Sequence, residues 1–268
     1  MLELPDVTLC CVDTRTVPQA LDAVHRCMAH ANFGRVLFLG PAPDATQIQT
    51  QANIDWVTIP QIRNIQDYNR IILHDLRDHI RTSHLLIVQW DGFITLPQLW
   101  RPDFLSVDYI GSPWYHAGHP GLVGNGGFSL RSRRLLDALA SLKYLDTTEP
   151  EDMVICVQLR AELERDHGIR FASLEMAQTF GCEYGGYRPS FGFHGMQNFA
   201  HVMDSSTLAT WLSDAPSDLL LTKHARKLIK ELIRTGRRAE ARSLIKQRRQ
   251  RTGWNKDSGL LYLRTLLP

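Results

Sequence analysis

Several features are scarce in this chain of 268 residues, and each absence excludes a class of protein. The five cysteines are odd in number and include no C-x-x-C pair, which argues against a disulfide framework and a zinc ribbon. The most apolar run, His84-LLIVQW, is interrupted by Gln89 and Asp91, and it falls short of the roughly 20 residues that span a bilayer. No internal repeat of fixed period and no low-complexity segment is visible.

The first residues also lack the pattern of a targeting segment. No basic stretch precedes the apolar part of Met1-LELPDVTLCCV, which carries Glu3 and Asp6 instead, so we expect no signal peptide and a cytoplasmic protein with reduced thiols. Hydrophobic residues make up 44% of the chain and charged residues 22%, values that exclude disorder, collagen and coiled coil. The length suits one large domain, or a domain with an appendage.

The net charge of +2 is unevenly distributed. The segment 223–251 holds 12 lysines and arginines against only Glu231 and Glu240, so its net charge is +10 and that of the remaining chain is −8. We therefore predict a mildly acidic domain over residues 1–204 and a basic helical appendage over residues 205–268.

Hydrophobic patterning indicates the order of elements in the first half. Short β-rich runs that end at polar, Gly or Pro residues predict strands at 7–12, 36–40, 55–59 and from His84 onward, and helices at 18–31 and 67–81. This β-α-β-β-α-β order predicts an α/β fold with a mostly parallel mixed sheet flanked by helices. Ligands of such sheets bind at the carboxyl ends of the strands, where Asp13 and Asp91 would lie.

The second half predicts a strand and helix after Gly124, a helix from Pro150, a strand at 168–173, and helices from about Ser205. Two apolar stripes separated by Gly236 predict a C-terminal helical hairpin. The stripes consist of Ala225, Leu228, Ile229, Leu232 and Ile233, then Ala239, Ala241, Leu244 and Ile245. We expect the basic side chains between them to be largely solvated: Lys227, Lys230, Arg234, Arg237, Arg238, Arg242, Lys246, Arg248 and Arg249.

Asp91 and His194 are candidate metal ligands. Asp91 follows the His84 strand, where a carboxylate can bind the hard cation that a diphosphate needs for charge neutralisation. His194 lies in Phe191-GFHG, and imidazole suits Mn²⁺ and similar ions, so the two side chains should approach within about 6 Å. The structural alternatives are that Asp91 starts a turn with Gly92 and that His194 is an ordinary packed loop residue.

The segment Gly124-NGGFSLRS is the second candidate site. Its three glycines indicate either positive φ angles or a backbone that approaches a ligand closely, at Gly126 and Gly127 above all. It is not a dinucleotide fingerprint, because G-x-G-x-x-G is absent. The alternative is a plain glycine-rich turn.

Glu151 and Asp152 form the third candidate site, at the start of a predicted helix. Thr148 and Glu151 have the spacing of a capping box, and acids in the first turn are stabilised by the helix dipole, so a structural role is open. A carboxylate held there behind a loop also suits a general base that deprotonates an acceptor hydroxyl.

In chain order, these segments resemble the GT-A class of nucleotide-sugar glycosyltransferases, and more closely a group of bacterial glycosyltransferase-like proteins. The resemblance rests on Gln89-WDGF in the place of the D-x-D motif, Tyr109-IGSPW, Gly124-NGGFSLRS followed by Glu151-DM, and Phe191-GFHG, and it covers roughly residues 7–200. It departs from the family pattern at Gln89, where the first acid of D-x-D is missing.

The resemblance implies a GT-A fold, with residues 1–204 as the catalytic domain. It implies transfer of a sugar from a nucleotide-sugar donor to a hydroxyl of a glycan or lipid-linked glycan, as in polysaccharide biosynthesis. In inverting members the corresponding acids make Asp152 the catalytic base and Glu151 an acceptor contact. Asp91 and His194 would bind Mn²⁺ or Mg²⁺.

For the donor, the resemblance implies nucleoside contacts from Asp13 and Thr14, a diphosphate contact from Asp91, and donor contacts from Gly126 and Gly127. UDP is the commonest nucleotide of D-x-D enzymes and is therefore the expected one.

Two other functions compete with this hypothesis. The first is a catalytically inactive module that binds a sugar nucleotide or a glycan. The second is association with nucleic acid through the basic tail, which the acidic body and the lack of a recognisable nucleic-acid module disfavour. For residues 223–251 we expect either a simple solvated face or peripheral contact with an anionic membrane surface on its cytoplasmic side.

Overall fold

The computed structural model describes residues 1–44, 47, 53–115, 122–142, 145–253 and 255–266. The chain forms two compact units, Met1–His194 and Gly195–Pro268, so the structural division lies ten residues before the boundary expected from the sequence. The ten strands of the described chain all lie in the first unit. They are β1 (Leu2–Val12), β2 (Ala31–Gly40), β3 (Asp55–Thr58), β4 (His84–Val88), β5 (Tyr109–Gly111), β6 (Pro113–Trp114), β7 (Leu122–Val123), β8 (Phe128–Ser132), β9 (Gly181–Cys182) and β10 (Gly192–Phe193).

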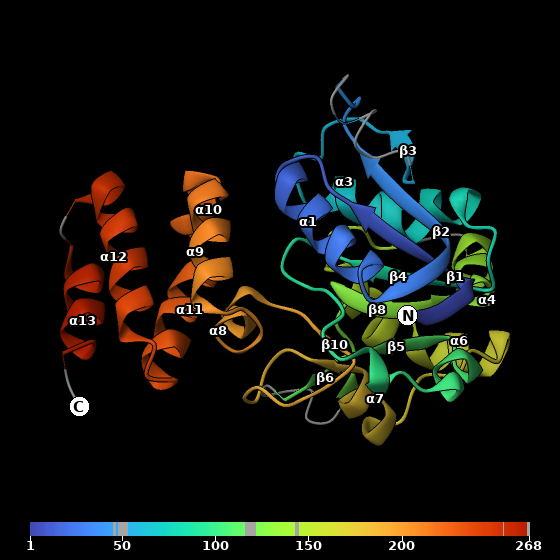
Figure 1. The fold of residues 1–268 in the computed structure, drawn as a ribbon. Coiled ribbons are helices and arrows are strands. Elements are labelled where there is room, and N and C mark those ends of the chain that lie inside the picture. Colours follow the sequence, from blue (N-terminus) through green and yellow to red (C-terminus); the bar gives the residue numbers. More distant parts are fainter. Residues whose placement is uncertain (45–46, 48–52, 116–121, 143–144, 254, 267–268) are drawn as a thin grey trace. The chain divides into compact units, whose positions relative to one another are not determined.

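A six-stranded sheet in the order β3-β2-β1-β4-β8-β5 forms the centre of the first unit (Figure 1). Strands β1 to β4 are parallel, whereas β8 runs antiparallel to both β4 and β5. The central strands are apolar on both faces, as expected where helices cover a parallel sheet on both sides. The predicted α/β class with a mostly parallel mixed sheet is therefore confirmed.

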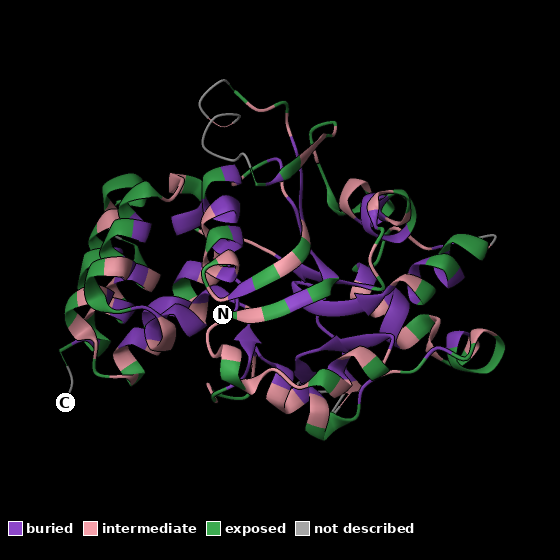
Figure 2. Ribbon diagram, turned by 45° about the vertical axis from the view of Figure 1, so that its right-hand side comes forward, coloured by how far each residue is buried: buried purple, intermediate pink, exposed green. Residues whose placement is uncertain are grey.

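The helices of this unit pack on both faces of the sheet. They are α1 (Val17–Met28), α3 (Ile65–Arg70), α4 (Arg133–Ser141), α5 (Glu151–Met153), α6 (Arg160–His167) and α7 (Leu174–Phe180). One face carries a cluster in which Cys10, Leu37 and Ile87 of the strands meet Ile72 and Leu136. Helix α1 packs against β1 and β2 outside this cluster. Figure 2 shows the resulting core as buried strands between partly exposed helices.

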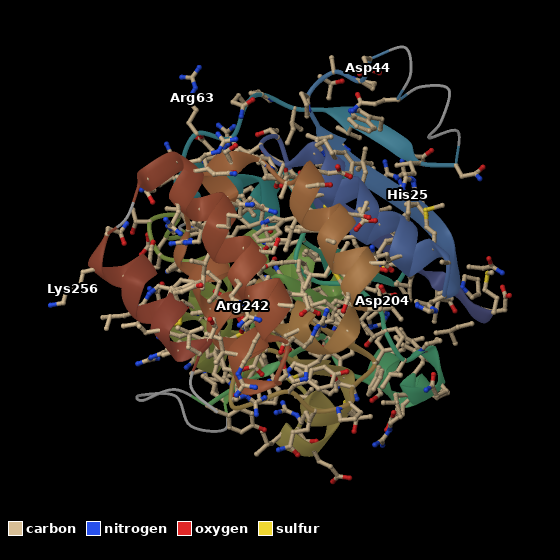
Figure 3. The ribbon with its side chains drawn as sticks, turned by 60° about the vertical axis from the view of Figure 1, so that its left-hand side comes forward. His25, Asp44, Arg63, Asp204, Arg242 and Lys256 are labelled. Carbon is tan, nitrogen blue, oxygen red and sulfur yellow. The ribbon has the colours of Figure 1, made fainter. Side chains whose placement is uncertain are left out.

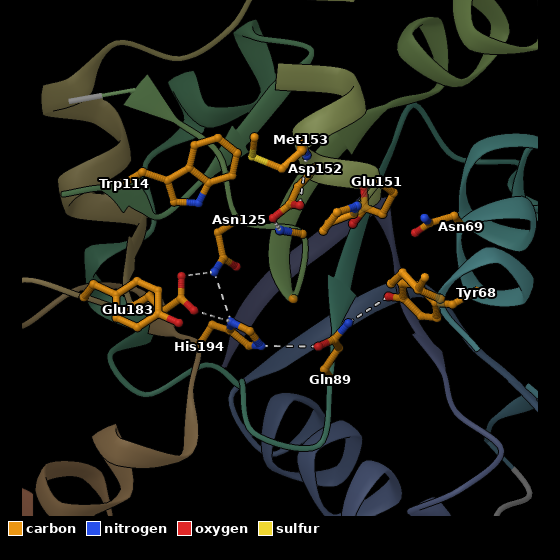
Figure 4. A pocket seen from close by; sticks show the side chains of 15 residues that line it. Tyr68, Asn69, Gln89, Trp114, Asn125, Glu151, Asp152, Met153, Glu183 and His194 are labelled. Carbon is orange, nitrogen blue, oxygen red and sulfur yellow. Dashed lines mark hydrogen bonds and ion pairs between the residues drawn. The ribbon is translucent and has the colours of Figure 1, made fainter. Parts of the chain in front are cut away.

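The helix predicted over residues 67–81 forms in three parts. The Asn64 side chain accepts the backbone N–H of Asp67 at 2.9 Å and so caps α3, which continues as a π-helical turn (Ile71–Asp75) and a 3₁₀ turn (Leu76–His79). The π turn shifts the helix phase while Ile71 and Ile72 stay in the core. Tyr68 thereby faces the carboxyl edge of the sheet, where the candidate site lies (Figure 4).

One predicted element in the second half is wrong. Residues 168–173 form no strand and contribute only an isolated bridge, between Phe171 and Tyr109. The helix predicted from Pro150 is again composite, with α5, a π-helical turn (Val154–Gln158) and α6. Its interruption leaves Glu151 and Asp152 on a separate short turn at the cavity wall. The five cysteines, all within the described residues, are buried and form no disulfide.

The second unit is helical throughout its described part. Its helices are α8 (Phe199–Val202), α9 (Ser205–Asp214), α10 (Ser217–Leu220), α11 (Lys223–Arg234), α12 (Arg238–Thr252) and α13 (Lys256–Arg264). The predicted hairpin is α11 and α12, which pack on each other and are joined through Gly236 with φ +78°. Leu228 and Leu244 of the two apolar stripes are fully buried. Helix α13 adds a third layer that the sequence patterning did not predict.

The basic side chains of this unit are only partly solvated, contrary to expectation. Lys230 and Lys246 are exposed, and Lys256 extends away from the helices in Figure 3. Arg237 instead donates to the carbonyls of Ala200 and Met203 at 2.9 and 2.7 Å, and Arg248 is half-buried against the start of α11. An arginine side chain has several N–H donors and a long apolar stem, so it can bind backbone carbonyls of two segments while partly buried. The ammonium group of lysine is more strongly hydrated and stays in water.

Among the described helices, none combines the length and the apolar character needed to cross a bilayer.

Candidate functional site

Two neighbouring cavities lie at the carboxyl ends of β1 and β4, where the sheet topology places ligands. The first, the Asp13 cavity, has a volume of about 340 Å³ and is lined by Val12, Asp13, Thr14, Arg15, Ile62, Asn64, Ile65, Tyr68, Gln89 and Trp90. The second, the Asp152 cavity, has a volume of about 310 Å³ and is lined by Ile65, Tyr68, Asn69, Gln89, Trp114, Asn125, Gly126, Gly127, Pro150, Glu151, Asp152, Met153, Glu183, Tyr184 and His194 (Figure 4). Ile65, Tyr68 and Gln89 line both.

Asp152 presents its carboxylate to the second cavity. Oδ2 accepts the backbone N–H of Gly126 at 3.1 Å, and Oδ1 accepts that of Met153 at 2.9 Å. Burial and the neighbouring charge of Glu151 raise the pKa of Asp152 to about 6, although the Gly126 N–H and Arg131 oppose the shift. The group is thus mostly ionised at neutral pH and more basic than an ordinary aspartate.

Glu151 forms a buried ion pair, not a capping box. Its Oε1 accepts Nη2 of Arg131 at 2.8 Å, and both side chains are almost inaccessible to solvent. Thr148 does not cap α5, because its hydroxyl donates to Asp146 at 2.6 Å. Arg131 also donates Nε to Ser129 at 3.1 Å and lies over the Tyr109 ring. Oε2 of Glu151 is buried and has no hydrogen-bond partner among the described residues.

The structure excludes positive φ angles at the glycines of the 124–127 loop and adds a reason for them within the chain, while the expected close approach to a ligand stays a prediction. Gly124, Gly126 and Gly127 do not have positive φ, whereas Asn125 does, at +67°. A Cβ on Gly126 would lie 1.8 Å from Oε1 of Glu151, and a Cβ on Gly127 would lie 2.2 Å from Nε2 of His194. Side chains of this same chain therefore leave no room for a Cβ at either position.

His194 is the centre of a buried polar network. Its Nε2 lies 3.2 Å from Oδ1 of Asp91, which confirms the expected proximity of these two residues, and its Nδ1 lies 3.2 Å from Oε1 of Glu183. Burial opposes the charged imidazolium, but the two carboxylates outweigh that effect and hold the pKa of His194 well above its ordinary value. Glu183 in turn accepts the side-chain amide of Asn125, which connects the glycine loop to His194.

Asp91 is both a turn residue and a partner of His194. The N–H of Gly92 donates to the Gln89 carbonyl at 3.0 Å, so the turn that was the structural alternative is present. The Asp91 side chain is only 4% exposed and lies outside the lining of the two cavities, in contact with the His194 ring.

Gln89 connects this network to the helix edge. Its Nε2 donates to the Tyr68 hydroxyl at 2.8 Å, and its Oε1 lies 3.3 Å from Nε2 of His194 (Figure 4). The residue at the position of the missing acid is therefore a polar bridge between the two cavities.

Asp13 and Thr14 line the Asp13 cavity, and their side chains also accept hydrogen bonds from the backbone around it. Asp13 accepts the backbone N–H groups of Arg15 and Thr16 at 2.7 and 2.6 Å. The Thr14 hydroxyl accepts the N–H of Ile62 at 2.9 Å. Their predicted contact with a nucleoside stays a prediction.

Sequence reasoning missed Arg131, Glu183, Tyr68 and Asn125 as site residues. Arg131 had a usable signal, since a charged residue inside the strand Phe-Ser-Leu-Arg-Ser needs a buried partner. Glu183 had none, because its partners Asn125 and His194 are 58 and 11 residues away in the sequence.

The chain is similar to several solved glycosyltransferase structures at low sequence identity. No curated protein matches the chain. A mannosyltransferase of Pyrobaculum calidifontis, solved with GDP-mannose and Mn²⁺, is 11% identical with a TM-score of 0.43, covering 98% of this chain and 86% of its own. The glycosyltransferase GlyE of Streptococcus pneumoniae is 10% identical with a TM-score of 0.40, covering 79% and 51%. The catalytic domain of Drosophila β1,4-galactosyltransferase 7 is 13% identical with a TM-score of 0.40, covering 64% of each chain.

The family comparison matches the part of the chain that holds most of the site. A model described as "Protein of unknown function (DUF5672)" matches residues 51–194, which is more than half of the chain. This range includes the site residues Gln89, Gly126, Asp152 and His194, while Asp13 precedes it. The chain therefore belongs to the DUF5672 family.

Proposed function

We propose that the protein is an inverting glycosyltransferase that moves a sugar from a nucleotide-sugar donor to a hydroxyl of a glycan or lipid-linked glycan. The observation that carries this proposal is Asp152, an ionised carboxylate with a pKa of about 6 at the wall of a cavity. A general base needs a pKa near the working pH and a fixed orientation, and the Gly126 N–H supplies the orientation. The motif resemblance assigns the same residue.

In this reaction Asp152 takes the proton of the acceptor hydroxyl while that oxygen attacks the anomeric carbon of the donor sugar. The new carbon–oxygen bond forms on the face opposite the leaving group. The bond to the nucleoside diphosphate breaks, and the diphosphate leaves with the electron pair. The Arg131–Glu151 pair lies next to Asp152, and Glu151 lines the same cavity as the candidate acceptor contact.

The donor would occupy both cavities. Its nucleoside, most commonly uridine in such enzymes, would enter the Asp13 cavity beside Asp13 and Thr14. Its sugar would enter the Asp152 cavity beside Gly126 and Gly127. The diphosphate would then lie between the two cavities, beside the shared lining residues Ile65, Tyr68 and Gln89.

Asp91 and His194 would hold a divalent metal ion, Mn²⁺ or Mg²⁺. Their contacting atoms are 3.2 Å apart, close to the roughly 3 Å between adjacent ligands on one octahedral ion with bonds of about 2.1 Å, and a carboxylate with an imidazole suits Mn²⁺. The described residues include no group of three or more His, Cys, Asp or Glu side chains that could bind a metal, so diphosphate and water would supply the other ligands. The ion would neutralise charge on the diphosphate.

The test is a panel of nucleotide-sugars with Mn²⁺, assayed for transfer by the wild type and by Asp152→Asn. We expect Asp152→Asn to lower turnover by about two to four orders of magnitude with little change in donor affinity. Glu149→Gln is the matched control, because Glu149 is an exposed acid on the same segment. Turnover of Asp152→Asn above a tenth of the wild type would refute the assignment.

The alternative is an inactive module that binds a sugar nucleotide or a glycan. It predicts that a nucleotide-sugar raises the melting temperature of the wild type, since a ligand of the native state stabilises it, while no panel member gives product. Product formation that depends on Asp152 excludes it.

We further propose that the second unit contacts an anionic membrane surface, where a lipid-linked acceptor would be found. Its helices expose the lysines Lys223, Lys230 and Lys246. Leu260 and Leu263 of α13 are 52% and 58% exposed, which is unusual for leucine and suits insertion between headgroups.

A further inference from the structure

Tyr68 lies where the two cavities meet, because it lines both of them. It belongs to α3 and is partly exposed, and its ring packs beside the core cluster of the sheet. Of the three residues that line both cavities, Ile65 has no polar side-chain atom. Tyr68 and Gln89 are therefore the two shared side chains that can bind a polar ligand.

The hydrogen bond between Gln89 and Tyr68 has a defined direction. Nε2 of His194 faces the Asp91 carboxylate at 3.2 Å, so this edge of the ring faces an acceptor as a donor or as a metal ligand. In both cases the Gln89 atom 3.3 Å from this nitrogen must be the amide oxygen, because the amide N–H₂ group would be repelled by a donor or by a metal ion. The amide N–H₂ then faces Tyr68 and donates to its hydroxyl at 2.8 Å.

The Tyr68 hydroxyl therefore keeps its own proton for another acceptor. A phenol has one donor and accepts through its lone pairs, and Gln89 occupies an acceptor position. Within the described part of the chain, no atom accepts the Tyr68 proton in a hydrogen bond. Burial, followed by the nearby charge of Glu151, raises the pKa of Tyr68, so the hydroxyl stays protonated at neutral pH.

We propose that the Tyr68 hydroxyl is a binding residue that donates a hydrogen bond to the donor's diphosphate where it passes between the two cavities. This inference rests on the proposed function, because a nucleotide-sugar is the ligand that would join the cavities. A neutral O–H donor binds an anionic oxygen strongly in a partly buried site.

The same arrangement explains why an amide, not an acid, occupies position 89. A residue that accepts at His194 and donates at Tyr68 needs both kinds of group, which the side-chain amide of Gln89 has and an ionised carboxylate lacks. A carboxylate at position 89 has no N–H and would itself capture the Tyr68 proton. Gln89→Glu should therefore prevent the Tyr68 hydroxyl from donating its proton to the ligand, while the tyrosine itself remains in place.

The first measurement is the dissociation constant for UDP and GDP, with Mn²⁺ present, by isothermal titration. Tyr68→Phe keeps the ring and should weaken binding about 10-fold, the effect of one hydrogen bond to a charged group, while the melting temperature falls only by the loss of the Gln89 hydrogen bond. Tyr187→Phe is the matched control, since Tyr187 is partly buried and lies outside both cavities, and it should bind like the wild type.

The second measurement is a double-mutant cycle with Gln89→Glu, which also adds a repulsive charge. That repulsion acts in both backgrounds, so the loss caused by Gln89→Glu should be several-fold smaller in Tyr68→Phe than in the wild type. Wild-type affinity in Tyr68→Phe, or equal losses in both backgrounds, would overturn the role of Tyr68. Failure of the wild type to bind any nucleotide would instead overturn the proposed function, and this inference with it.

Discussion

Asp152 is a carboxylate in surroundings that oppose its charge. Burial and Glu151 raise its pKa to about 6, while the Gly126 N–H limits the shift. The same features make the group a stronger base and make the folded protein less stable at neutral pH, because an ionised group is kept away from water.

The pH dependence of transfer should report this group. Asp152 must be deprotonated to accept the acceptor proton, so kcat/KM should fall tenfold per pH unit below about 6 and level off above it. The measurement is kcat/KM between pH 4.5 and 8.5 with the metal kept saturating. An acidic limb near pH 4, the ordinary range of aspartate, would contradict the assignment.

Asp152→Asn should stabilise the protein at alkaline pH. Between the unfolded pKa near 3.8 and the folded pKa near 6 the native state binds more protons, so the wild type loses up to about 3 kcal/mol as pH rises through this window. Asparagine retains an acceptor for the Gly126 N–H and has no charge. Urea unfolding should therefore show a gain of about 1–3 kcal/mol at pH 8 and a smaller gain at pH 4.5. Equal differences at both pH values would contradict this account.

Arg131 and Glu151 should depend on each other for stability. Arg131→Met leaves the Glu151 charge buried without its partner and should lower the free energy of unfolding by about 3–5 kcal/mol. Arg131→Met with Glu151→Gln removes both charges and should recover part of that loss. The check is a double-mutant cycle in urea, and additive losses would show that the two side chains do not act as a pair.

At the scale of elements, the glycine loop is defined by the side chains that close onto it. Gly127→Ala would place a Cβ 2.2 Å from the His194 ring, so we expect a loss of about 1–3 kcal/mol in stability and a large loss of transfer activity. Gly259→Ala in α13 is the matched control, because its Cβ would meet nothing within 4 Å and alanine favours a helix by about 1 kcal/mol. Unfolding and transfer assays on both variants test this difference.

The elements of the sheet were predictable where hydrophobic patterning alone determines them. The apolar runs expected as strands at 7–12, 36–40 and from His84 all form strands, but β1 begins at Leu2 and β2 at Ala31, so both extend over polar residues that precede the apolar run. The strand expected at 168–173 is reduced to one bridge, between Phe171 and Tyr109, because backbone hydrogen bonds to Asp108 and Tyr109 involve only the adjacent residues 170 and 172. The π and 3₁₀ turns that interrupt the 65–79 helix pack against α4. Such contacts between distant segments cannot be predicted from the sequence of the helix alone.

The candidate site was predictable in its motif residues and not in their partners. Asp152 and His194 stand in recognisable local patterns, so they could be identified from the sequence. Arg131 and Glu183 act through contacts over 20 and 11 residues, and Gln89 reaches His194 over 105 residues. Such pairs exist only once the sheet edge, the glycine loop and the last strand are assembled.

At the scale of the whole molecule, the charges of the chain have two different roles. Arginines such as Arg237 and Arg248 join helices of the second unit through backbone carbonyls. The exposed lysines Lys223, Lys230 and Lys246 make no comparable bonds to backbone carbonyls within the described residues. Arg242 and Arg251 are exposed as well, so a binding role for the basic unit would draw on these arginines together with its lysines.

Membrane contact can be tested with variants that retain the helices. Each lysine near an anionic surface contributes about 1 kcal/mol, so Lys223→Glu, Lys230→Glu and Lys246→Glu together should lower vesicle affinity by at least about 100-fold. Leu260→Ser with Leu263→Ser should weaken it further by removing apolar insertion. The measurement is co-sedimentation of the full chain with phosphatidylserine-containing vesicles at low salt.

The matched control reverses three exposed arginines of the first unit, Arg63, Arg70 and Arg81, to glutamate. The total charge then changes by the same amount, so a general effect of net charge would weaken both triple variants equally. Docking through the second unit requires a loss confined to the lysine variant, with the steep salt dependence of a surface held by charge. Equal sedimentation of all forms, or none by the wild type, would leave the second unit without a membrane role and turn the search for the acceptor to soluble glycans.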